Sequence, residues 1–220
     1  KRGMIATFMA KWSMDYPGQS GHVHQSLLST EDGRNVFFDA NEPHSMSATM
    51  HHYVGGLRHH MRPLLAVTSP TINSYTRLVK GAWAPTAATW GVENRTAALR
   101  VIEGSDKSQR VEFRVGSADA NPYLVAAANL GAGLTGISEK LDPGEAAVGN
   151  AYELQSELPQ GYQLCGNLRD ANREFVNSEV ATQMFGDTFV AHYAASRDWE
   201  VREYERAVND WQLRRYFEII

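Results

Sequence analysis

Charged and apolar positions alternate most clearly between residues 94 and 115, which contain Asn-Arg-Thr, Leu-Arg-Val-Ile and Arg-Val-Glu-Phe-Arg in that order. A period of two places successive side chains on opposite faces of a sheet, so we expect two strands joined by the polar loop Glu103–Gln109. The two faces of the second strand hold Arg110, Glu112 and Arg114 on one side, and Val111, Phe113 and Val115 on the other. The apolar face predicts packing against helices, which leaves the charged row to line a cavity.

The charged row has the chemistry of an anion site that also holds a metal. Guanidinium groups bind phosphate and carboxylate oxygens in pairs, and a lone glutamate among arginines can hold a divalent cation that those anions share. The alternative is a salt-bridged outer face of an antiparallel sheet, which has no binding role. The pattern of these residues leaves both interpretations open.

Upstream, residues Arg2–Trp12 are expected to form a strand, and a turn at Asp15–Gly21 follows. Alternation then places His22, His24 and Ser26 on one face of the next strand, and Asp32-Gly33 predicts a hairpin turn into Val36-Phe37-Phe38. Two histidines at positions i and i+2 are compatible with a metal site, but also with a structural or merely exposed pair.

Helical spacing of apolar residues predicts a helix over 47–68 and another over Tyr123–Leu141, which begins at the potential cap Asn121. The second helix is rich in alanine and glycine, so we expect it to lie close behind the charged strands. A polar loop, Asp142–Gln163, leads to a helical tail with one helix near Leu168–Met184 and a long one from Asp187 onward. The expected fold is α+β, a curved antiparallel sheet with a charged concave face, backed by helices.

Composition narrows the function classes. The 220 residues are 43% hydrophobic with a net charge of -4. The sequence contains no basic stripe, so we do not expect nucleic acid as a partner. No apolar run approaches membrane-spanning length, and the single cysteine, Cys165, excludes an intrachain disulfide; we therefore expect a cytoplasmic protein. The chain starts at Lys1 within an apparent strand, which suggests that it is part of a longer protein.

Two further groups stand out in the sequence. The loop around Gly81-Ala82-Trp83-Ala84-Pro85 combines small residues with a large aromatic ring, as in a lid, although tryptophans also pack in plain structural loops. Four histidines in the first helix are expected at the surface and receive no role; they are His51, His52, His59 and His60.

Six motifs give the chain a resemblance to the catalytic domain of the glutamine synthetase family, and their order and spacing cover nearly all of it. They are Ala-Thr-Phe-Met-Ala-Lys at 6–11, Gly-Gln-Ser-Gly-His-Val-His-Gln-Ser at 18–26, Ser-Tyr-Thr-Arg-Leu at 74–78, Asn-Arg-Thr at 94–96, Arg-Val-Glu-Phe-Arg at 110–114 and Asn-Pro-Tyr-Leu at 121–124. Each motif alone is weak, whereas together they are specific.

The resemblance implies an ATP-dependent ligase that phosphorylates the side-chain carboxylate of L-glutamate and then forms a γ-amide with a nitrogen nucleophile. It also implies roles for matching residues. The metal, Mg²⁺ or Mn²⁺, would be bound by His22 and Glu112, and the transferred phosphoryl group by Arg95. Nucleotide-binding positions are His24, Ser26, Arg100, Lys107 and Arg110, and glutamate-binding positions are Gly18, Arg77 and Arg114.

Part of the family's pattern is missing from residues 1–220. Family members have a small N-terminal domain and the carboxylates of a second metal site upstream of the matching region, and they assemble as stacked rings with active sites between subunits. Residues 1–220 then correspond to a catalytic domain without its upstream part. We expect a homo-oligomer for the longer protein and no activity for this chain alone.

Trp83 is the second departure. Ammonium-using members carry a glutamate in a Gly-Tyr-Glu-Ala-Pro loop, and indole cannot replace a carboxylate base. Indole can cover an organic amine, or meet an alkylammonium through its π face, so we expect an organic amine as the substrate. The alternatives are an ammonium-using enzyme with a shifted loop, a non-catalytic relative that binds nucleotide or joins rings, and a single-metal hydrolase built on His22 and His24.

Overall fold

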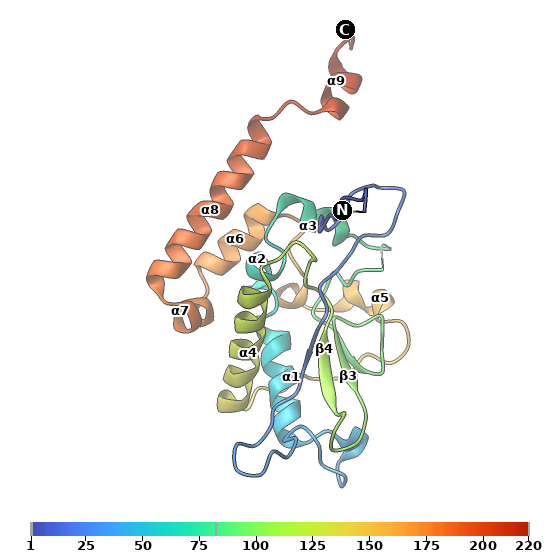
Figure 1. The fold of residues 1–220 in the computed structure, drawn as a ribbon, viewed down its shortest axis with the longest axis vertical. Coiled ribbons are helices and arrows are strands. Elements are labelled where there is room, and N and C mark those ends of the chain that lie inside the picture. Colours follow the sequence, from blue (N-terminus) through green and yellow to red (C-terminus); the bar gives the residue numbers. More distant parts are fainter. Residues whose placement is uncertain (1, 82, 220) are drawn as a thin grey trace.

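A sheet of four strands lies beside a layer of helices in the computed structural model, which describes residues 2–81 and 83–219 (Figure 1). The strands are β1 (Val23–Gln25), β2 (Trp90–Val92), β3 (Leu99–Ile102) and β4 (Arg110–Phe113). Their spatial order is β1-β4-β3-β2. The α+β fold class expected from the sequence is confirmed.

The sheet is mixed, so the expectation of a wholly antiparallel sheet was wrong for one strand pair. β4 is antiparallel to both β1 and β3, whereas β2 runs parallel to β3 with Trp90 opposite Leu99. Glu93 has a left-handed φ of 49° directly after β2 and turns the chain away from the strand. Residues 94–98 then return the chain to the start of the strand, so β3 repeats the direction of β2.

Two long helices form the layer behind the sheet, and each begins at a side-chain cap. In α1 (Ala48–His60) the Ser47 side chain accepts a hydrogen bond from the Met50 amide, and in α4 (Pro122–Glu139) Asn121 accepts from the first turn. We expected α4 to back the strands directly, but it packs chiefly on α1, which itself contacts β3. The apolar side chains of β3 and β4 are buried on this side; they include Leu99, Val101, Val111 and Phe113.

Glycine permits the close approach of α1 and α4. A Cβ atom added to Gly136 would lie 2.2 Å from the His52 carbonyl oxygen and 2.5 Å from the Gly56 nitrogen. Both neighbours are backbone atoms of α1, which cannot rotate out of the way. The small residues noted in the sequence therefore serve helix–helix packing.

The remaining described helices are short, except for α8, and three of them lie within the loop expected over Asp142–Gln163. They are η1 (Pro43–Ser45), α2 (Leu65–Thr68), α3 (Ile72–Arg77), α5 (Ala151–Leu154), η2 (Gln155–Glu157), η3 (Gln160–Tyr162), α6 (Leu168–Val176), α7 (Glu179–Phe185), α8 (Asp187–Arg206) and α9 (Asp210–Tyr216). α8 projects from the body and carries α9 at its outer end (Figure 1).

Three predicted helices are interrupted. The helix expected over 47–68 ends at His60 and resumes as α2, with Pro63 in the intervening turn, where its missing N–H suits a helix break. The one expected over Leu168–Met184 divides before Ser178, because the Ser178 side chain caps a new helix by accepting from the Ala181 amide. The final helix similarly restarts at the cap Asn209.

The N-terminal region differs most from expectation. Residues 2–12 form no strand; the Ala10 carbonyl accepts from the Gln19 amide, and the Lys11 backbone bonds the Asn73 side chain, so no strand partner is used. The turn at Asp32-Gly33 is confirmed, but in Val36–Phe38 only Phe38 forms a bridge, an isolated one with Met46. Among the described helices, none combines the length and apolar character that a membrane crossing requires.

Candidate active site

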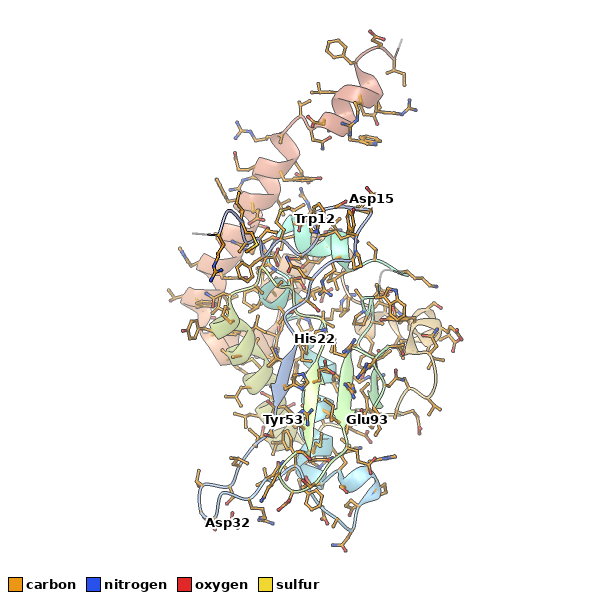
Figure 2. All side chains as sticks on the ribbon, turned by 45° about the vertical axis from the view of Figure 1, so that its right-hand side comes forward. Trp12, Asp15, His22, Asp32, Tyr53 and Glu93 are labelled. Atoms are coloured by element: carbon orange, nitrogen blue, oxygen red, sulfur yellow. The ribbon has the colours of Figure 1, made fainter. Side chains whose placement is uncertain are left out.

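Glu112 lies at the centre of the charged face of the sheet. In the strand register, His24 on β1 and Arg100 on β3 are both directly opposite Glu112 on β4. The predicted alternation is confirmed, since Val111 and Phe113 point into the core while this row of polar side chains faces the other way. Figure 2 shows His22 at the end of the strands where β1 begins.

Four basic side chains surround the Glu112 carboxylate, which is only 5% exposed. Oε1 lies 2.8 Å from His22 Nδ1, 3.0 Å from Arg114 Nη1 and 3.7 Å from His24 Nε2. Oε2 lies 3.4 Å from Arg100 Nη1. Residues in or next to β1, β3 and β4 thus meet at one carboxylate, and the shared face of Glu112 and Arg114 follows the predicted alternation.

The charges around this carboxylate set the protonation states of the group. Burial favours the neutral form of Glu112, but Arg114, the two histidines and Arg100 outweigh it and lower the pKa of the carboxyl. Burial, followed by the nearby Arg114, lowers the pKa of His22 despite the opposing effect of Glu112. At neutral pH the site therefore presents an ionised carboxylate beside a neutral imidazole, the forms in which both groups bind metals.

This donor set fits one divalent cation in part. Imidazole nitrogen and carboxylate oxygen suit Mn²⁺, and carboxylate oxygen suits Mg²⁺. Within residues 2–81 and 83–219, no cluster of three or more histidine, cysteine, aspartate or glutamate side chains forms a metal site. A cation held by His22 and Glu112 would accordingly need further oxygen ligands from water, phosphate or another part of the protein.

Gly18 and Arg77, predicted to bind glutamate, lie together beside the chain that follows Arg114. Arg77 donates through Nη2 to the carbonyls of Val115 and Gly116, and burial lowers its pKa to about 10, so it stays charged at neutral pH. Its Nε is buried without a hydrogen-bond partner in the described structure. A Cβ on Gly18 would lie 2.6 Å from the Ala10 carbonyl oxygen and 2.8 Å from Arg77 Cγ, so this close packing requires glycine.

The other predicted site residues are more exposed. Arg110 donates from Nε to His24 Nδ1 at 3.2 Å, which joins it to the central cluster. Ser26 follows β1, Arg95 lies in the turn after β2, and Lys107 lies in the loop between β3 and β4. Trp83 is 81% exposed and has a left-handed φ of 57°.

Glu93 is a residue of this site that the sequence pattern did not single out. Its carboxylate accepts two hydrogen bonds from the Arg100 guanidinium, at the edge of the charged face. The sequence offered one signal, a carboxylate that directly follows an apolar strand and precedes Asn-Arg. That signal is weak because a solvent-exposed acid in a turn has the same pattern.

The fold and the site define a class of protein in which a small mixed sheet presents arginines, imidazoles and one carboxylate on one face. The chain belongs to the glutamine synthetase family: residues 1–216 match the family model described as glutamine synthetase, catalytic domain. The resemblance found in the sequence is thereby confirmed.

Similar proteins include both a glutamine synthetase and a ligase named for an organic amine. The chain is 41% identical over its whole length to type-1 glutamine synthetase 2 of Dictyostelium discoideum, of which it covers 42%. It is 42% identical, again over its whole length, to glutamate–isopropylamine ligase of a Pseudomonas species, of which it covers 47%. The chain thus spans about half the length of these relatives.

A solved structure of a GmaS/ADP complex has the same fold. It superposes with a TM-score of 0.85 at 34% sequence identity, over 97% of this chain and 49% of that one. The agreement includes the mixed sheet and the helical layer, so the architecture described above is that of the family.

Proposed function

We propose that the protein containing this chain is an ATP-dependent ligase that joins L-glutamate to an organic amine. The γ-carboxylate of glutamate attacks the terminal phosphorus of ATP, and ADP leaves. The amine nitrogen then attacks the γ-carbonyl carbon, loses a proton and expels phosphate, which yields a γ-glutamyl amide. ATP carries several negative phosphate charges and glutamate carries two carboxylates, which matches a charged face with several guanidinium groups.

The proposed roles follow the arrangement around Glu112. His22 and Glu112 would hold Mg²⁺ or Mn²⁺, which when bound offsets negative charge on the phosphates. Arg95, exposed after β2, would contact the transferred phosphoryl group as its charge develops. The nucleotide would contact His24, Ser26, Arg100, Lys107 and Arg110, and glutamate would contact Gly18, Arg77 and Arg114.

One feature of the site limits the role of Arg77. Its Nη2 atom is occupied by the Val115 and Gly116 carbonyls, so only the rest of its guanidinium is left for a ligand. The free Nε of Arg77 is buried. Arg77 therefore supports the backbone beside Arg114 as well as carrying positive charge toward the proposed glutamate position.

The exposure of the Trp83 side chain is the main observation in favour of an organic amine as the substrate. At 81% exposure the indole is not buried in this chain, which disfavours the alternative that it merely packs in a structural loop. An exposed indole can cover the alkyl part of an amine or face an alkylammonium. The name of the relative that uses isopropylamine supports the same choice.

A second candidate is an ammonium-using glutamine synthetase, supported by the name of the Dictyostelium relative. A non-catalytic relative that binds nucleotide or joins a ring is a third. Since residues 1–220 span about half of the relatives, we propose that activity requires an upstream part and assembly into a homo-oligomer, with this chain alone inactive.

The test measures ADP release with ATP, glutamate and Mg²⁺ or Mn²⁺ in the protein extended upstream to the length of its relatives. Ammonium, methylamine, ethanolamine and putrescine are compared. We expect higher kcat/KM for one organic amine, and a shift toward ammonium in the Trp83→Glu variant. Trp199→Glu, at an exposed tryptophan of α8, is the matched control and should change nothing. Unchanged amine preference in Trp83→Glu would refute the role of Trp83, and nucleotide binding without ADP release would favour the non-catalytic relative.

A further inference from the structure

Glu93 has a backbone conformation that side chains rarely adopt. Its φ of 49° lies in the left-handed region, where the Cβ atom crowds the backbone. The conformation is held by the sheet, because the Glu93 amide donates to the Val101 carbonyl at 2.8 Å. Glycine would fit this position without strain, so the presence of a glutamate calls for a contribution from its side chain.

Both carboxylate oxygens of Glu93 are used. Oε1 accepts from the Glu103 amide at 3.1 Å, which ties the end of β2 to the end of β3. Oε2 accepts from Arg100 Nε at 3.0 Å and also from Arg100 Nη2. Glu93 thus occupies one edge of the Arg100 guanidinium.

The remaining edge of Arg100 is directed along the charged face. Arg100 Nη1 lies 3.4 Å from Glu112 Oε2, and the Arg100 side chain is only 17% exposed. Glu93 and Glu112 outweigh the effect of burial and raise the pKa of Arg100, so this guanidinium is a fixed positive charge. If Glu93 did not hold the Nε edge, Arg100 would be free to pair fully with Glu112, the proposed metal ligand, or to turn toward solvent.

We infer that Glu93 is a positioning residue that holds the Arg100 guanidinium in the orientation required to bind nucleotide phosphate, given the ATP-dependent function proposed above. Its carboxylate takes the Nε and Nη2 edge of Arg100, so that only Nη1 reaches Glu112, at 3.4 Å. Glu93 itself acts through Arg100 and needs no contact with the nucleotide. Figure 2 shows Glu93 at the far side of the sheet from β1, at the edge of the charged face.

The experiment measures ADP affinity, in the presence of Mn²⁺, of the protein extended to the length of its relatives. Glu93→Gln removes the charge and Glu93→Gly also removes the backbone strain. We expect about 10-fold weaker ADP binding and a similar rise in the KM for ATP in both variants, with a smaller change in kcat. Glu93→Gly should not lower the melting temperature, so the loss of nucleotide affinity would occur without a loss of stability.

The matched control is Glu174→Gln. The Glu174 side chain is 40% exposed and pairs at 2.7 Å with Arg62, which is 17% exposed. Glu93 and Arg100 form a similar pair, with the Glu93 side chain 44% exposed and the Arg100 side chain 17% exposed. This variant should leave ADP affinity unchanged. A cycle with Arg100→Gln is the second readout: if Glu93 acts through Arg100, the double variant binds ADP no more weakly than Arg100→Gln alone.

The outcomes separate this inference from the proposed function. If the unmodified protein does not bind ADP, the ATP-dependent function and the role of Glu93 both fail. If it binds ADP and both Glu93 variants bind equally well, only the role of Glu93 is overturned. Additive losses in the cycle would also overturn it, because they would mean that Glu93 affects the nucleotide independently of Arg100.

Discussion

The two sides of the small sheet are held by different contacts: charged side chains meet on one face, and apolar side chains and helix backbone meet on the other. On the charged face, Glu112 is 5% exposed and contacts basic side chains from neighbouring strands. In the layer of α1 and α4 behind the sheet, contacts are made by apolar side chains and by the bare backbone at Gly56 and Gly136. A histidine on each side shows the contrast: His22 has the Glu112 carboxylate as a partner, whereas His60 Nε2 is buried with none in the described structure.

This difference in contacts implies that the charged face contributes mainly to activity and the helical layer mainly to stability. Gathering charges in a partly buried site costs desolvation, and such clusters add little net stability. Close packing of helices, by contrast, is sensitive to the addition of a single methyl group. We therefore expect substitutions on the charged face to affect turnover first, and substitutions in the helical layer to affect folding first.

The largest expected effect is the loss of turnover in Glu112→Gln. Glutamine keeps the size and acceptor oxygen of the side chain but removes the charge that a cation and the arginines share. We expect kcat to fall by about 10³-fold and Mn²⁺ affinity to fall as well, in the protein extended to full length. Steady-state ADP release and calorimetric Mn²⁺ titration measure the two quantities. Retained turnover in Glu112→Gln would mean that the charged face is not the active site.

The second prediction concerns the helical layer. A methyl group on Gly136 would contact the backbone of α1 at His52 and Gly56, so Gly136→Ala must push the helices apart. We expect the free energy of unfolding to fall by about 3 kcal/mol, measured by urea denaturation. Gly166→Ala is the control, because a Cβ at Gly166 meets no atom within 4 Å. Equal losses in both variants would show that the α1–α4 contact does not limit stability.

Local patterns predicted β3 and β4 of the charged face and the row of Arg110, Glu112 and Arg114 on one side of it. β3 and β4 are adjacent in sequence and joined by a short loop, so the period of two fixed both their faces and the position of Glu112 between arginines. The cap Asn121 was equally local, since its side chain bonds the first turn of its own helix. These features depend on residues a few positions apart, which is why the sequence reveals them.

Features that depend on distant partners were not predictable in the same way. The parallel pairing of β2 with β3 results from the path of residues 93–98, and the expected strand at residues 2–12 finds no pairing partner. Ser178 and Asn209 were not recognised as new helix caps, because serine and asparagine are also common within polar helix surfaces. The role of Glu93 depends on its left-handed backbone, which no alternation of polar and apolar residues encodes.

The smallest effect we predict is a pH dependence of stability from His60. Burial lowers the pKa of His60 below its ordinary value of 6.5, chiefly because the charged form is poorly solvated, with the nearby Glu139 opposing the shift and His59 adding to it. As pH falls through the ordinary histidine range, the unfolded chain binds this proton before the folded chain does. Linkage then requires that stability falls with decreasing pH, and that the contribution is flat above about pH 6.5.

His60→Leu removes the titrating group, and its Nε2 has no hydrogen bond to lose within the described residues. We expect the variant to lose less stability than the unmodified chain between about pH 7.5 and pH 5, measured by urea denaturation at each pH. His192→Gln, at an exposed position of α8, is the control. An unchanged slope in His60→Leu would mean that the proton is taken up equally by both states. The half-buried His60 would then be as well solvated as an exposed histidine, and only the Glu112 partner would distinguish His22 from it.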